Sequence, residues 1–81
     1  MRHVADDQGR SWAPVAVPSR GAHLRMGATL GFRPADAPDA EPLLTSIRFN
    51  SDQAAALAIG SMSDWELRRR LGLAQAEVGA R

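Results

Sequence analysis

Three consecutive arginines, Arg68, Arg69 and Arg70, form the longest run of like charge in this 81-residue sequence. Guanidinium groups bind phosphate and carboxylate in a bidentate manner, so the run could contact nucleic acid or an acidic protein. Asp64 precedes Arg68 by four residues and Glu66 precedes Arg70 by four. Acid-first pairs at this spacing stabilise a helix by about 0.2–0.5 kcal/mol each. We therefore expect a solvated helix face with two of the three charges paired, and phosphate or acidic-protein binding as the alternatives.

The sequence gives little support for catalysis or metal binding. It contains no cysteine, and its two histidines, His3 and His23, are twenty residues apart. They could meet Asp6 or Asp7 at a metal ion, but their spacing does not require it. Neither histidine has a neighbour that suggests an activated nucleophile, and a chain this short leaves little room for a deep pocket. We expect no enzyme activity, no catalytic residue, no metal and no cofactor.

Charge and hydropathy limit the classes of partner. The formal net charge is +1, which is too small to attract nucleic acid over a long range. No apolar run approaches the roughly 20 residues that a membrane span needs. Residues 1–10 are too polar to be the apolar segment of a signal peptide. We therefore expect a cytoplasmic protein without a membrane span.

Alternating apolar and polar residues predict three strands. Residues 23–32 alternate regularly, which is typical of a strand with one buried face. Residues 11–18 are rich in β-branched side chains but contain two prolines, so we expect an edge strand that a tight turn at Gly21 joins to the next. Residues 43–49 alternate again and predict a third, antiparallel strand. The segment 33–42, with three prolines and three acids, predicts an extended surface loop.

Capping patterns predict two helices near the end of the sequence. Asn50 or Ser51 could cap a helix that ends at Gly60. Its alanine-rich centre is apolar all round, so we expect it to be buried on most sides or to meet another subunit. Ser63 and Glu66 have capping-box spacing. They predict a second helix over 64–71, and Gly72 predicts its end.

Residues 66–78 resemble the first helix, turn and second-helix start of the phage-repressor helix-turn-helix family. The family places its DNA-reading helix after this point. That element would lie beyond the last residues of the sequence, so the resemblance identifies no DNA-contacting residue here.

Together these patterns predict an α+β domain of order β-β-β-α-α, in which two C-terminal helices cover one face of a three-stranded antiparallel sheet. The domain should occupy residues 11–73, with the proline-rich loop at 33–42. Residues 1–10 should be a flexible arm in which Asp-Gln-Gly at 7–9 forms a turn. Residues 74–81 should be a tail that could add a helical turn or two. The predicted core contains Leu24, Met26, Leu30, Phe32, Ile47, Phe49, Leu57, Trp65, Leu67 and Leu71.

The leading hypothesis for function is a small non-catalytic interaction or regulatory module that binds a larger protein or itself. The sequence is short, lacks a catalytic cluster, and has an apolar helix that a lone small domain does not need. The predicted interaction surface contains Trp12, Arg25, Arg48, Ile59, Trp65, Arg68, Arg69 and Arg70. The alternative is a small nucleic-acid-binding regulator with a basic patch of Arg68, Arg69 and Arg70 together with Arg20, Arg25 and Arg48.

Overall fold

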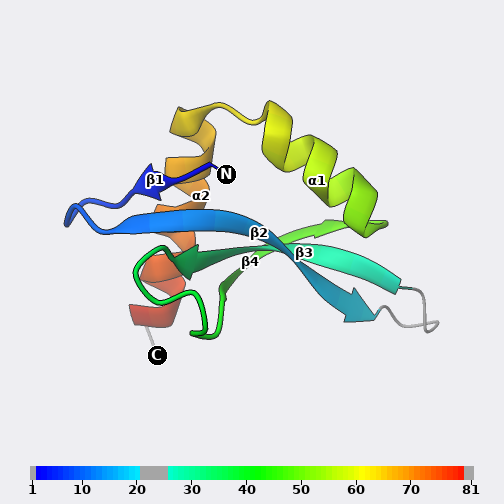
Figure 1. Cartoon of the computed structure of the whole chain (residues 1–81), viewed down its shortest axis with the longest axis horizontal. Helices are drawn as coiled ribbons and strands as arrows, with labels where there is room; N and C mark the ends of the chain where they lie inside the picture. Colours follow the sequence, from blue (N-terminus) through cyan, green and yellow to red (C-terminus); the bar gives the residue numbers. More distant parts are fainter. Residues whose placement is uncertain (1, 21–25, 80–81) are drawn as a thin grey trace.

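The computed structural model describes residues 2–20 and 26–79 (Figure 1). Its elements are β1 (Val4–Ala5), β2 (Ser11–Arg20), β3 (Met26–Pro34), β4 (Leu43–Phe49), α1 (Asp52–Ser61) and α2 (Asp64–Gly79). The four strands form one antiparallel sheet in the order β1-β2-β3-β4. The expected α+β class is confirmed. The expected number of three strands is wrong, because β1 adds a fourth.

The extra strand comes from the segment that the sequence predicted as a loose arm. Val4 pairs with Trp12 across β1 and β2, and its side chain is only 5% exposed. The turn from β1 to β2 is closed by a bond from the Asp6 amide to the Arg10 carbonyl, 2.9 Å long. Gly9 has a φ of +82° there, a conformation that glycine adopts at no steric cost. The turn was readable in the sequence, whereas a two-residue strand is too short to show alternation.

Strand β2 is an edge strand along most of its length, as its prolines predicted. β1 pairs only with the first two residues of β2, Ser11 and Trp12. Pro14 and Pro18 lie beyond that pairing, so their missing amide hydrogens leave no gap in a ladder. On its other side β2 pairs with β3 from Trp12 to Arg20. The expected turn at Gly21 lies outside the described residues.

Strand β4 keeps the predicted alternation despite an irregular pairing with β3. Thr29 lies opposite Arg48 and Gly31 opposite Leu44, so one β3 residue faces three β4 residues between them. The Thr45 hydroxyl donates to the Leu30 carbonyl at 2.8 Å and accepts the Ile47 amide at 3.1 Å. These side-chain bonds replace the missing ladder bonds. The side chains of β4 therefore remain alternately half-buried and exposed.

The loop between β3 and β4 is folded into turns and is not extended as the sequence suggested. The Ala37 amide donates to the Pro34 carbonyl at 3.1 Å, and the Ala40 amide donates to the Ala37 carbonyl at 3.0 Å. Proline presets the backbone dihedral that such turns need, so this composition is compatible with turns as well as with an extended chain.

Both predicted helix N-caps are present, but the predicted end of the second helix is wrong. Ser51 Oγ accepts the Ala54 amide at 3.0 Å, and Ser63 Oγ accepts the Glu66 amide at 3.1 Å. α2 continues through Gly72 to Gly79. A glycine in a helix interior costs about 1 kcal/mol relative to alanine, and burial of the next turn, including Ala74, offsets this cost. No helix-turn-helix break therefore occurs within 66–78.

The core lies between one face of the sheet and the two helices (Figure 1). Its buried members are Val4, Trp12, Leu30, Phe32, Leu67 and Leu71, with the partly buried Leu43, Ile47, Phe49, Ile59 and Met62 around them. Of the predicted core, Leu24 and the side chain of Met26 lie outside the described residues.

Two residues of the predicted core are at the surface instead. Leu57 is 70% exposed and Trp65 is 68% exposed. α1 faces the sheet through Ala55 and Ile59, one turn apart, so Leu57 between them points away. In the same way Trp65 lies two positions before the buried Leu67. α1 is thus covered on one side only, in contrast to the burial on most sides that its composition suggested.

Candidate interaction surfaces

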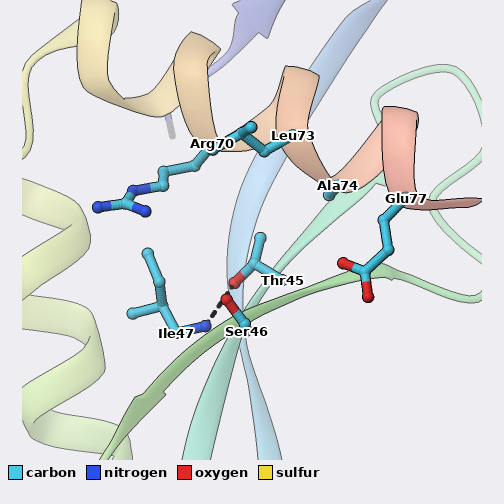
Figure 2. Close-up of a pocket in the computed structure, with 7 residues that line it drawn as sticks. All are labelled: Thr45, Ser46, Ile47, Arg70, Leu73, Ala74 and Glu77. Carbon is cyan, nitrogen blue, oxygen red and sulfur yellow. Dashed lines mark hydrogen bonds between the residues drawn. The ribbon is translucent and has the colours of Figure 1, made fainter.

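Helix α2 lies between the two edge strands of the sheet and touches both. On one side, Arg68, Gly72 and Gln75 line a hollow with residues 5–7 of β1 and its turn. On the other side, Arg70, Leu73, Ala74 and Glu77 line a hollow with Thr45, Ser46 and Ile47 of β4 (Figure 2). The two sides of α2 differ in how firmly they are joined to the sheet.

The β1 side is held by hydrogen bonds that converge on Asp6. Trp12 Nε1 and Gln75 Nε2 each donate to Asp6 Oδ2 at 3.0 Å. The amides of Gln8 and Arg10 each donate to Asp6 Oδ1 at 2.9 Å. One carboxylate therefore joins the β1–β2 turn, strand β2 and helix α2.

These donors favour the ionised form of Asp6. The bond from Trp12, followed by that from Gln75, lowers the pKa of Asp6 from 3.8 to about 2. The carboxylate is thus fully charged at neutral pH, where it acts as a structural acceptor. Because its partners join a turn, a strand and a helix, the residue serves the fold.

The N-terminal segment is also joined to the connection between the helices by Arg2. Its guanidinium donates to the carbonyls of Ile59, at 2.8 Å, and of Met62. It also forms an ion pair of 2.6 Å with Asp64. The carbonyls at a helix C-terminus attract positive charge, so Arg2 supports the end of α1 and the start of α2 together. Sequence reasoning missed this role, because Arg2 and its partners are about sixty positions apart.

The arginine run is divided among three environments. Arg70 Nε donates to Glu66 Oε1 at 2.9 Å, as the spacing predicted. Arg69 also approaches Glu66, at 4.0 Å. Asp64 pairs with Arg2 instead of Arg68, so Arg68 is exposed and forms none of the ion pairs within the described part of the chain.

Trp65, Arg68 and Arg69 form one surface, which we call the α2 outer face. They are spaced at i, i+3 and i+4 and so share one side of the helix. All three side chains are exposed, and the Arg69 guanidinium carbon lies 6.0 Å from the centre of the Trp65 ring. This cation–π distance is at the outer limit for a favourable interaction. The α2 outer face thus presents a large aromatic ring flanked by positive charge.

A second surface is the β4–α2 groove, a hollow of about 190 Å³ lined by Leu44, Thr45, Ser46, Ala74, Glu77 and Val78. Leu44 and Val78 are about half exposed, as is Leu73, which lines the adjoining hollow with Arg70 and Glu77. Figure 2 shows that Arg70 and Glu77 extend from α2 on either side of Leu73 and Ala74, toward opposite ends of residues 45–47. Sequence reasoning missed this groove, since the two elements that line it are some thirty residues apart.

The other predicted site residues are dispersed. Trp12 is 9% exposed and belongs to the core, and Ile59 packs against that core. Arg48 lies at an exposed position of β4, a different element from the arginine run. Arg25 lies outside the described residues, as does the side chain of Arg20. Of the four arginines named for a basic patch whose side chains are described, Arg68 and Arg69 share the α2 outer face, whereas Arg70 is bonded to Glu66 and Arg48 lies on β4.

Within the described residues, no group of three or more histidine, cysteine, aspartate or glutamate side chains is placed to hold a metal ion. No described helix is both long and apolar enough to cross a membrane. A comparison with protein-family models, with curated proteins and with solved structures finds no match to this chain.

Proposed function

We propose that this protein is a small non-catalytic interaction module that binds a larger protein through the α2 outer face. The observation that carries the proposal is the exposure of Trp65, which is 68% accessible on a well-capped helix and has two arginines beside it. Tryptophan and arginine are the residues most enriched at binding hot spots. An exposed tryptophan contributes little to the stability of its own domain, and this favours a role in binding.

The charge of the α2 outer face suggests the chemistry of the partner. Arg68 has no ion-pair partner within the described part of the chain, and Arg69 is only loosely paired with Glu66 at 4.0 Å. A partner that offers an apolar slot bordered by aspartate or glutamate would fit the ring and both guanidinium groups. We therefore propose an acidic protein surface as the target.

Affinity capture with a matched set of baits tests the proposal. Wild-type protein and the variants Trp65→Ala and Gln53→Ala are immobilised, and the proteins retained from a lysate of the source cells are quantified. Loss of a hot-spot side chain costs about 2 kcal/mol or more, so Trp65→Ala should weaken capture of the partner about 30-fold. Gln53→Ala, at an exposed position on α1, should not. Identical capture by wild type and Trp65→Ala would reject the α2 outer face as the binding surface.

Nucleic-acid binding is the alternative, and the same surface allows a direct test. Arg68 is its best remaining contact, because Arg70 is held by Glu66 and Arg48 lies on strand β4, apart from the arginine run. A shift of labelled duplex at about 50 mM salt that Arg68→Ala abolishes would favour this alternative, since phosphate contacts dominate such binding. No shift at that salt concentration would leave the protein-binding proposal as the better one.

A further inference from the structure

We infer that the β4–α2 groove is a self-association surface, and that its occupant is a second copy of this chain related by a two-fold axis. The inference goes beyond the proposed function, because it names a second binding surface and its partner. It concerns a different surface from the α2 outer face, so the two can fail separately.

The first support is the open edge of β4. β4 is seven residues long, ends the sheet order, and pairs only with β3 among the described residues. Natural edge strands are protected from pairing by shortness, proline or charge. β1 is protected by its length of two residues, and β2 carries Pro14 and Pro18. β4 has no proline, and Arg48 is its one charged residue.

The second support is apolar surface beside this edge. The buried side of α2 runs through Leu67, Leu71 and Ala74, and Val78 continues it at helical spacing. Val78 is nevertheless 52% exposed. Leu73, which lines the adjoining hollow between Arg70 and Glu77, is 53% exposed. Leu44 of β4, across the groove from Val78, is 50% exposed. The apolar side of α2 therefore continues beyond the residues that the sheet covers, next to the open edge of β4.

The third support is charge complementarity between two copies of the groove. Arg70 and Glu77 are seven residues apart, so they share one side of α2 about 10 Å apart along its axis. The midpoint between them falls at Leu73 and Ala74, beside Ser46 at the centre of β4 (Figure 2). A two-fold axis there would bring Arg70 of each copy to Glu77 of the other. Arg70 uses Nε for Glu66, which leaves its terminal nitrogens available for this second carboxylate.

The same axis would place β4 antiparallel to β4 of the second copy, with the two Ser46 residues opposite each other. A contact in which each patch meets its own copy is the commonest kind of closed oligomer. This pairing would extend the sheet to eight strands and give hydrogen-bond partners to the open backbone groups of β4. It would also cover Leu44, Leu73 and Val78. A second copy of the chain is thus complementary to the groove in strand pairing, apolar surface and charge.

Light scattering coupled to size exclusion tests this inference on the purified chain. The wild-type protein should have twice the 8.7 kDa chain mass at micromolar concentrations. Leu73→Glu and Glu77→Arg should each halve the mass. The first brings two acidic side chains together beside the axis, and the second places a positive charge against Arg70 of the other copy. Adding Arg70→Glu to Glu77→Arg should restore the doubled mass. Leu57→Glu, the same change at an exposed leucine of α1, should leave the mass doubled.

Disulfide trapping gives a readout that does not depend on disrupting the interface. The chain has no cysteine, so Ser46→Cys introduces a single thiol where opposed side chains would lie about 5 Å apart. Mild oxidation should convert most of this variant to a covalent dimer, and Ser61→Cys on exposed α1 should remain uncrosslinked. A folded wild-type protein of single-chain mass at all concentrations would overturn the inference. A doubled mass that Leu73→Glu and Glu77→Arg leave unchanged would also overturn it, because the association would then use another surface or another partner.

Discussion

The two edges of the sheet are built in opposite ways. β1 has two residues, yet the carboxylate of Asp6, the guanidinium of Arg2 and the buried Val4 hold its segment to the rest of the fold. β4 has seven residues and follows its predicted alternation, yet its outer side meets only a groove beside α2. The comparison shows that edge protection does not scale with strand length. The short edge is bonded to the rest of its own chain, whereas the long edge carries the proposed self-association surface.

The largest expected effect follows from removing Trp12 at the β1 edge. Trp12→Ala should lower the free energy of unfolding by about 3–5 kcal/mol, because it empties a buried site and removes a donor to Asp6. Trp65→Ala is the matched control at an exposed tryptophan and should change stability by less than about 0.5 kcal/mol. Urea unfolding followed by far-ultraviolet circular dichroism measures both. Equal losses would contradict the assignment of one tryptophan to the core and the other to the surface.

A smaller effect is expected from Arg2, which joins the β1 segment to both helices. Arg2→Ala should cost about 1–3 kcal/mol, because the Ile59 and Met62 carbonyls and Asp64 lose a charged donor. Arg2→Lys keeps the charge but offers a single donor position, so it should recover only part of the loss. The same unfolding experiment measures both variants. A stability unchanged in Arg2→Ala would show that the N-terminal segment contributes no support to the helix connection.

The β1 edge should also respond to acid. The folded-state pKa of Asp6, about 2, lies below its ordinary value of 3.8, so its contribution is complete above pH 4 and is lost as the pH falls toward 2. Wild-type melting temperature should therefore fall more steeply over that interval than that of Asp6→Asn, which has no charge to lose. At pH 7 the variant should melt below wild type. Parallel pH profiles would contradict a role for the Asp6 charge at this edge.

The smallest effect on stability is expected at the β4 edge. Leu73→Glu and Leu57→Glu should each change the unfolding free energy of the single chain by less than about 0.5 kcal/mol, since both leucines are more than half exposed. The measurement is made at a concentration where both variants are monomeric. A loss above 2 kcal/mol in Leu73→Glu would indicate that the groove supports the monomer and is not reserved for association.

The candidate surfaces were predicted only in part, and the two tryptophans show the reason. Sequence reasoning placed Trp12 on an interaction surface and Trp65 in the core as well as on that surface. Trp12 is buried because Val4 of β1 pairs beside it and Asp6 accepts its indole hydrogen. Val4 belongs to a strand too short to predict, and Asp6 follows it in the turn to β2. Trp65 is exposed because Leu67, two positions later, is on the buried side of α2 and Trp65 therefore points away from it. A spacing pattern alone does not say which side of a helix packs against the sheet.

The sequence by itself determined the features that depend on neighbouring residues. Alternation identified β4, serine caps identified the starts of both helices, the Asp-Gln-Gly turn marked residues 7–9, and acid-first spacing identified the Glu66–Arg70 pair. Tertiary structure alone decided the fourth strand, the extension of α2 past Gly72 and the meeting of α2 with both sheet edges. Local preferences act within a few residues, whereas Arg2 meets Ile59 and Asp6 meets Gln75 across most of the chain. Leu44 and Val78 line one groove from distant parts of the sequence. Such contacts depend on how the apolar faces are buried together, which no single stretch of sequence specifies.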